Sequence, residues 1–243
     1  MIISYFRYLI WLAIIPVVQL CNYVNSRDSN REPEYVLRKF FVLGILSTIP
    51  AYFIERYMET VLPDDSTVFM NNGYYGLFIN VLLGVGIVEE LCKYAIVLFL
   101  GYNNKEFDQT YDIVVYSVYT SLGFACFENL LYSFEGGIST AIMRMFTAVP
   151  GHACFGVIMG YFFSKAKKRE IKKDYFGEVI YMILAIFVPS ILHAIYDSLV
   201  MTESGEYFLI WIVYVVGLFA VSYHEVNKMS ANNITFRRNG FKY

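Results

Sequence analysis

Long apolar stretches, separated by short polar connections, follow one another along almost the whole chain. Because an α-helix needs about 20 mainly apolar residues to cross the hydrocarbon core of a bilayer, stretches of this length predict membrane-spanning helices. Seven segments approach or exceed that length, namely 4–22, 36–57, 75–101, 110–134, 138–164, 176–201 and 206–224. The connections are too short for a soluble domain. The pattern therefore predicts that residues 1–243 form a single all-α membrane domain of about seven spans.

The composition strengthens this prediction. Apolar residues make up 57% of the chain and charged residues only 16%, whereas about a quarter of the residues in an ordinary soluble domain are charged. The expected surroundings of such an apolar chain are the lipid bilayer. A net charge of −2 gives no indication of a nucleic-acid partner. The four cysteines lie in apolar runs without a CxxC spacing, so we expect reduced packing residues.

The distribution of Lys and Arg between the loops predicts the orientation, because basic residues in short loops resist translocation. The first, third and fifth loops and the C-terminal tail are basic, whereas the centres of the other loops contain only acidic charges. The basic positions are Arg27, Arg31, Arg38, Lys39, Lys105, Lys165, Lys167, Lys168, Arg169, Lys172, Lys173, Lys228, Arg237, Arg238 and Lys242. We therefore expect the N-terminus outside and the C-terminus inside.

Ionisable side chains interrupt the apolar spans. Each one costs about 2.5–3.5 kcal/mol near the bilayer centre, so several together need a mutual or functional explanation. In the third span, Lys93 follows Glu89 by one helical turn and Glu90 by three residues. Since one ammonium group cannot neutralise two carboxylates, we expect one glutamate to be protonated, bound to a metal, or facing water.

The next three spans add further polar groups. Glu128 and Asn129 lie in the fourth span, His152 follows a Pro-Gly pair in the fifth, and His193 and Asp197 are four residues apart in the sixth. Each could alone be structural, as part of a neutral ion pair, a core imidazole or an interhelical hydrogen bond. Their occurrence on four consecutive spans favours a functional site.

These residues suit hydrolysis in two ways. In the first, His152 and His193 with a carboxylate such as Glu89 or Glu128 bind zinc or another divalent metal, and a second glutamate acts as base. In the second, Glu89 or Glu90 deprotonates a water with the assistance of His152. His193, with Asn129 or Asp197, then stabilises the oxyanion.

Three common protease signatures do not occur in the sequence. There is no HExxH, the strongest spacing signal for a zinc protease, no G-x-S-x-G, and no GxGD with paired aspartates. The sequence therefore does not favour serine or aspartyl proteolysis. A proton- or divalent-metal-coupled transporter remains an alternative, because buried acids and imidazoles also serve as relay groups. A noncatalytic receptor or scaffold is a third class.

Four ordered motifs resemble the PrsW family of intramembrane proteases, which is itself similar to the CAAX-prenyl endopeptidase and bacteriocin-processing (CPBP) superfamily. They are Glu89-Glu90-x-x-Lys93, Gly123-Phe124-Ala125-x-x-Glu128-Asn129, Gly151-His152-x-x-Phe155 and His193-x-x-x-Asp197. The resemblance covers about residues 86–200, within an expected catalytic core of 75–201. Relative to the prenyl-protease pattern, Lys93 stands near the place of an arginine and Asp197 replaces an asparagine.

The resemblance implies an activity and a setting that the spacing of the residues does not provide. It implies an endopeptidase of the bacterial cytoplasmic membrane that makes the site-1 cut in a single-span substrate such as an anti-sigma factor, in a stress response. The family is described as metalloproteases, whereas a metal-independent glutamate and histidine have been proposed for the wider superfamily. Both mechanisms therefore remain open at this point.

Overall fold

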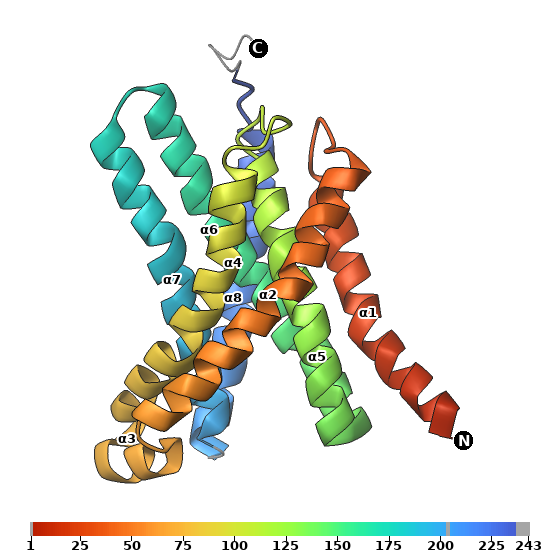
Figure 1. Ribbon diagram of the computed structural model, residues 1–243, viewed down its shortest axis with the longest axis vertical. Coiled ribbons are helices and arrows are strands. Elements are labelled where there is room, and N and C mark those ends of the chain that lie inside the picture. The colour runs from red at the N-terminus through yellow and green to blue at the C-terminus, as the bar shows by residue number, and fades with distance from the viewer. Residues whose placement is uncertain (1, 203–204, 237–243) are drawn as a thin grey trace.

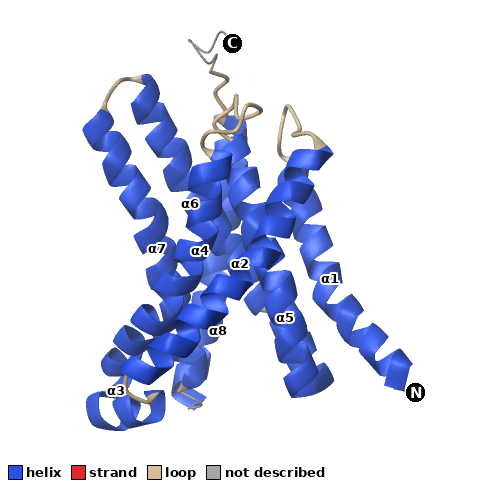
Figure 2. Cartoon of the chain, in the orientation of Figure 1, coloured by secondary structure: helices blue, strands red, loops and turns tan. Residues whose placement is uncertain are grey.

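The computed structural model of the chain describes residues 2–202 and 205–236, and over these ranges the structure is almost entirely helical (Figures 1 and 2). One isolated β-bridge, between Gln109 and Thr235, joins two loop segments. The helices are α1 (Ile2–Ser26), α2 (Glu34–Val61), α3 (Asp65–Val81), α4 (Ile87–Ile96), α5 (Asp112–Phe146), α6 (Ala148–Ile171), α7 (Tyr175–Met201) and α8 (Gly205–Ala231), with π-helical turns η1 (Leu82–Gly86) and η2 (Val97–Gly101) on either side of α4.

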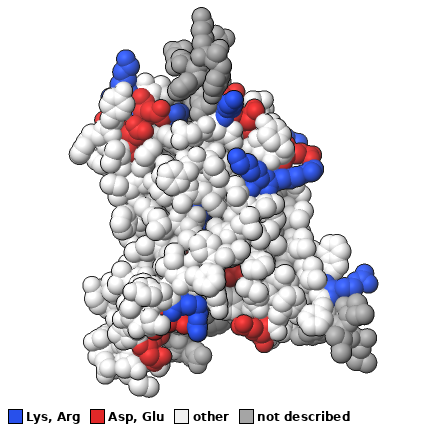
Figure 3. Space-filling model, in the orientation of Figure 1, with Lys and Arg blue, Asp and Glu red and all other residues white. Residues whose placement is uncertain are grey.

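Within the described residues, five helical stretches are long and apolar enough to cross a membrane. They are Phe6–Ser26, Glu34–Val61, Asp112–Ile171, Tyr175–Met201 and Gly205–Ala231. The third of these contains both α5 and α6. On the face shown in Figure 3, most charged side chains lie towards the two ends of the molecule, with a broad, largely uncharged band between them. This distribution is that of a helix bundle surrounded by lipid.

The predicted span 75–101 is not one continuous α-helix. The helical segment begins earlier, at Asp65, bends at Gly73 with φ +64°, and becomes π-helical on both sides of α4. A Cβ atom at Gly86 would lie 2.8 Å from the backbone oxygen of Ser190, so glycine permits a close approach of η1 to α7. Such π-helical turns occur often at functional sites, and this one ends three residues before Glu89.

The chain reverses at the boundary predicted between the spans 110–134 and 138–164, but the helix ends differ from those of the two spans. The helical backbone of α5 continues to Phe146, but at Gly137 it adopts φ +76° and ψ −163°, a conformation that favours glycine. The chain folds back there, since Arg144 forms an ion pair with Glu128. The next helix, α6, begins only at Ala148. The predicted span 138–164 therefore combines the folded-back end of α5, residues 138–146, with the first part of α6.

Helix α5 forms the centre of the bundle and packs against α1, α2 and α6. Its crossing with α2 depends on two glycines. A Cβ atom at Gly123 would lie 2.1 Å from the backbone oxygen of Phe41, and one at Gly44 would lie 2.1 Å from that of Thr120. Small residues at such a crossing let two backbones approach closely within a membrane. The glycine of the Gly123-Phe124-Ala125 motif therefore has a packing role.

Candidate active site

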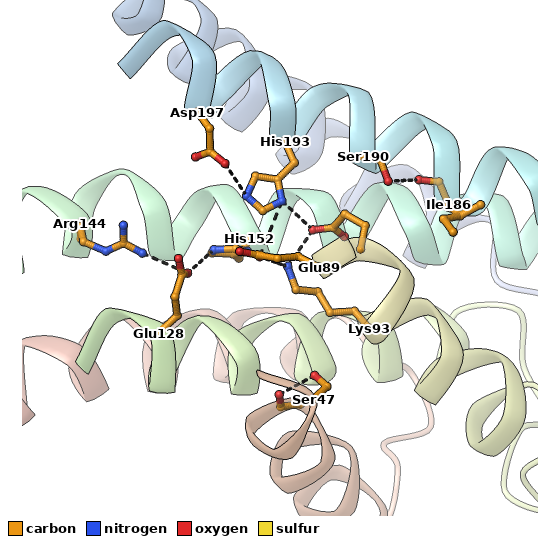
Figure 4. Close-up of polar contacts among 12 residues, drawn as sticks. Ser47, Glu89, Lys93, Glu128, Arg144, His152, Ile186, Ser190, His193 and Asp197 are labelled. Carbon is orange, nitrogen blue, oxygen red and sulfur yellow. Dashed lines mark hydrogen bonds and ion pairs between the residues drawn. The ribbon is translucent and has the colours of Figure 1, made fainter. Parts of the chain in front are cut away.

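Four helices bring together the eight polar residues that the sequence motifs singled out. Figure 4 labels six of them, all except Glu90 and Asn129. We call this set the polar cluster. Its members are Glu89, Glu90 and Lys93 on α4, Glu128 and Asn129 on α5, His152 on α6, and His193 and Asp197 on α7. Most members are buried, and Glu90, Lys93 and Asn129 are completely inaccessible. The spacing of the motifs thus correctly predicted that these side chains converge.

The ammonium group of Lys93 lies at the centre of the cluster. Its Nζ donates to Glu90 Oε1 at 2.7 Å and to Glu89 Oε2 at 3.1 Å, and it lies 3.0 Å from Nδ1 of His152. The three donors of the ammonium are thereby all used. Nζ also lies 4.1 Å from the ring centroid of Phe124, a favourable position for a cation. One lysine therefore contacts both glutamates and fixes an imidazole.

His152 is held between Lys93 and Glu128. Because a lysine ammonium has no acceptor, Nδ1 of His152 must accept the hydrogen bond from Lys93. The proton of the neutral ring is then on Nε2, which donates to Glu128 Oε2 at 2.8 Å. Glu128 also pairs with Nη2 of Arg144 at 3.0 Å. The ring orientation and tautomer of His152 are thus set by its two neighbours.

His193 lies between two other carboxylates. Its Nδ1 is 3.1 Å from Glu90 Oε1, and its Nε2 is 3.2 Å from Asp197 Oδ2. Ionised carboxylates only accept hydrogen bonds, so an imidazolium with both N–H groups satisfies this arrangement. The ring of Phe155 stacks on His193 with centroids 4.8 Å apart. The predicted pairing of His193 with Asp197 on one helix face is confirmed.

The two adjacent glutamates have different surroundings. The Glu90 side chain is completely buried and contacts both Lys93 and His193, while its Oε2 is buried without a hydrogen-bond partner among the described residues. The Glu89 side chain remains 5% exposed, with one contact to Lys93 at 3.1 Å and a longer one to His193 at 3.9 Å. Glu89 is therefore the less constrained carboxylate and the one that water can reach more easily.

Two further charged residues belong to this neighbourhood. Arg144, besides pairing with Glu128, donates from Nε to Oδ1 of Asn129 at 3.3 Å, so Asn129 joins the cluster through the arginine. The Nδ2 atom of Asn129 is buried and without a partner among the described residues. Glu55 of α2 interacts electrostatically with Glu128 and Lys93. The sequence motifs did not place Arg144 or Glu55 in the site, although Arg144 lies inside an apolar run and Glu55 lies near the end of one.

The donor types of the cluster match those of a zinc site, but the position of Lys93 opposes metal binding. Glu89, Glu90, His152 and His193 each offer one ligand atom within 4.8 Å of the others, so Glu90 takes the place predicted for Glu128. Lys93 Nζ already contacts three of these four residues. A cation among them would lie next to an ammonium group and would compete for the same lone pairs. With Lys93 in this position, the residues do not fit a metal ion.

A pocket of about 460 Å³ lies outside the polar cluster. It is apolar, and its lining includes Tyr74, Tyr207, Ile195 and Leu199. Ile195 and Leu199 are each two residues after a member of the His193–Asp197 pair, which corresponds to about 200° around an α-helix. The pocket therefore lies on the opposite side of α7 from the imidazole and is not the space in which the polar cluster acts.

Comparison with known proteins identifies relatives over most of the chain. A family model described as "PrsW family intramembrane metalloprotease" matches residues 32–222, which include the whole cluster. The chain is 32% identical to Protease PrsW of Oceanobacillus iheyensis over 222 residues, covering 91% of this chain and 95% of the relative. It is 35% identical to Protease PrsW of Geobacillus kaustophilus, covering 80% of each chain, and 32% identical to that of Bacillus subtilis, covering 84% and 85%. No solved structure matches.

Proposed function

Because this chain belongs to the PrsW family of intramembrane proteases, we propose that its polar cluster hydrolyses a peptide bond in a membrane-anchored regulatory protein. The family and the helices that can span a membrane make the chain a multi-pass protein of the bacterial cell membrane and an intramembrane protease. The matched relatives carry the name of a protease, so the transporter alternative is not supported. The contact of Lys93 with two glutamates and His152 is the observation that carries the proposed mechanism.

The proposed topology has seven passes, with the N-terminus outside and the C-terminus inside. An odd number of passes is supported by the direction of the helices, since α1 begins at the lower end of the molecule in Figure 1 and α8 ends at the upper end. The orientation is supported by the distribution of Lys and Arg between the loops. Residues 65–101 supply a further pass through α3, η1, α4 and η2, which are individually too short to span a membrane. The proposed catalytic core is 75–201, which contains every member of the polar cluster.

In the proposed mechanism Glu89 is the general base. A water beside its carboxylate gives a proton to Glu89 and attacks the carbonyl carbon of the scissile bond. When the carbon–nitrogen bond breaks, the same proton passes from Glu89 to the leaving amine. General acid–base catalysis of this kind contributes about 10²–10⁴-fold to the rate. Lys93 keeps Glu89 in place through the 3.1 Å hydrogen bond between Nζ and Oε2.

The negative charge that develops on the carbonyl oxygen needs positive groups or hydrogen-bond donors nearby. The ammonium of Lys93 and an imidazolium at His193 provide positive charge, and the unpartnered Nδ2 of Asn129 provides a free donor. Glu128 holds His152, which accepts a hydrogen bond from Lys93 and so orients the ammonium group. In the dry interior of the bundle these interactions are stronger than they would be in water.

The proposed substrate is a regulatory protein with one membrane span, such as an anti-sigma factor. The support is the location of the polar cluster, which is buried among helices that can span a membrane. A peptide bond reaches such a site most directly from within or beside the bilayer. An extended segment next to the end of a single span can enter there, whereas the bonds inside a folded soluble domain cannot.

We expect cleavage to persist without a metal, because Lys93 occupies the space that a metal ion needs. The test uses purified protein and a single-span substrate in proteoliposomes, with and without a zinc chelator, together with metal analysis of the same sample. The expected results are less than one metal ion per chain and rates that agree within about twofold. Loss of cleavage on chelation and its recovery with Zn²⁺ would contradict the metal-free mechanism, and no cleavage in any sample would contradict the proposed function.

A further inference from the structure

A second group of buried carboxylates lies far from the polar cluster. We call it the acidic cluster, and it consists of Asp28 and Glu32, in the segment between α1 and α2, and Asp112, the first residue of α5. Asp112 precedes Glu128 by 16 positions on α5, which corresponds to about 24 Å along a helix. The two clusters are therefore separate sites near different parts of the same helix.

The acidic cluster is compact and inaccessible. Asp28, Glu32 and Asp112 are 5%, 7% and 0% exposed, and each offers one oxygen within 4.8 Å of the others. Neighbouring groups fix the orientation of the carboxylates. Tyr116 donates to Glu32 Oε2 at 2.7 Å, and the backbone N–H groups of Gln109 and Asp108 donate to Asp112 Oδ2 at 2.7 and 3.0 Å.

Two carboxylate oxygens of the acidic cluster lack a hydrogen-bond partner among the described residues. Asp28 Oδ2 and Asp112 Oδ1 are both buried without a hydrogen-bond partner in the described part of the chain. Among the described residues, no lysine, arginine or histidine forms an ion pair with any of the three carboxylates. Three ionised carboxylates that are buried with no ion-pair partner in the described ranges are costly, because burial removes water and each charge repels the other two.

We propose that the acidic cluster binds one hard divalent cation of the Ca²⁺ or Mg²⁺ type. Such ions prefer carboxylate oxygens and complete their coordination with water. Two ligands on opposite sides of a Ca²⁺ ion lie about 4.6–5.2 Å apart, given Ca–O distances of about 2.3–2.6 Å. The three oxygens of the acidic cluster are spaced closely enough to share one ion. Neither nitrogen nor sulfur ligands are available among its members, which disfavours zinc.

The consequence of binding is structural, and the inference does not rest on the proposed protease function. An ion held by Asp28, Glu32 and Asp112 joins the connection between α1 and α2 to the beginning of α5. The same region already has a hydrogen bond from Tyr111 to the backbone oxygen of Val24 at 3.2 Å. The cation would therefore fix the end of the helix that carries Glu128, at a distance from the catalytic groups.

The test measures cation binding to the full-length protein in detergent after removal of divalent ions with a chelator. Tb³⁺, a luminescent substitute for Ca²⁺, is excited through tyrosine, and the Tyr116 hydroxyl contacts the proposed ligand Glu32. Ca²⁺ or Mg²⁺ is then added to displace Tb³⁺, and the melting temperature is recorded in parallel. We expect saturable luminescence, its displacement by Ca²⁺ or Mg²⁺, and a rise of several degrees in melting temperature.

Matched variants distinguish cation binding at the acidic cluster from cation binding at other acidic groups. Glu32→Gln, which preserves an acceptor for Tyr116, and Asp112→Asn should each weaken cation binding at least about tenfold. Glu106→Gln removes a carboxylate from the loop before α5 that accepts from Tyr35 instead and should bind normally. The double variant His152→Ala/His193→Ala, which alters only the polar cluster, should also bind normally.

Two results would overturn the proposal. One is a wild-type protein whose luminescence and melting temperature do not respond to any of the three cations. The other is an equal response in wild type and Glu32→Gln, which would place the ion elsewhere. If Asp112→Asn does not fold, the wild-type titration and Glu32→Gln still decide, because glutamine retains the size and hydrogen-bonding capacity of the glutamate.

Discussion

Replacement of Glu89 by glutamine is expected to lower the rate of substrate cleavage by about 10²–10⁴-fold, the usual contribution of a general base. The amide preserves the shape of the side chain and can still accept the hydrogen bond from Lys93, but it cannot take a proton from water. Stability should change less than for Glu90→Gln, because Glu89 makes the longer contact with Lys93 and its amide can keep that hydrogen bond. The measurement is the single-turnover cleavage rate in proteoliposomes, together with the melting temperature.

Glu90→Gln provides the comparison that separates the two glutamates. Glu90 contacts both Lys93 and His193, so its replacement should disturb the positions of both groups and lower the melting temperature as well as the rate. His224→Ala, a change of the exposed histidine on α8, should affect neither quantity. If Glu89→Gln cleaved at the wild-type rate while Glu90→Gln was inactive without loss of stability, the two roles would have to be exchanged.

Lys93→Met is expected to produce the largest loss of stability of any single change in the polar cluster. It removes the cation that lies closest to both glutamates, and it leaves Glu90 with His193 alone and Glu89 with only the 3.9 Å contact to His193. Removal of one partner from a buried ion pair costs about 3–5 kcal/mol. Cleavage should also be lost, because Lys93 positions Glu89 and His152. The measurement is the free energy of unfolding in detergent by denaturant titration.

The matched control is Lys228→Met on α8, which breaks an exposed ion pair with Glu225 and should change stability by less than about 1 kcal/mol. A double variant, Lys93→Met/Glu90→Gln, should regain part of the stability lost in Lys93→Met, because one uncompensated carboxylate has been removed. If Lys93→Met were as stable as Lys228→Met, the two buried glutamates would not both be ionised in the folded protein.

The hydropathy pattern predicted the helical class and most helix positions, because lipid imposes a minimum length of apolar sequence. Glu89, Glu128 and His193 stand out within apolar runs because burying a charge is costly, and their side chains do converge. Arg144 reaches Glu128 because the chain reverses at Gly137, between the predicted spans 110–134 and 138–164, but hydropathy does not show which side chains such a reversal brings together. The π-helical turns beside α4 are equally invisible in a hydropathy pattern.

The acidic cluster shows a different limit of prediction from sequence. Asp28 and Glu32 lie in a connection between helices, where acidic residues are common and normally solvated. Only the folding of this connection onto the start of α5 buries them beside Asp112. Glu55 was overlooked for a related reason, because it lies near the end of the predicted span 36–57, where a charge is readily taken as interfacial.

The most direct test of the central claim is cleavage of a purified single-span substrate by the purified protein in proteoliposomes made with ¹⁸O-labelled water. Mass spectrometry then identifies the products and the isotope in the new carboxyl terminus. We predict two fragments, with one ¹⁸O atom incorporated at the new C-terminus by the wild-type protein and no cleavage by Glu89→Gln. An intact substrate with the wild-type protein, or equal cleavage by Glu89→Gln, would contradict the proposal that this cluster hydrolyses peptide bonds.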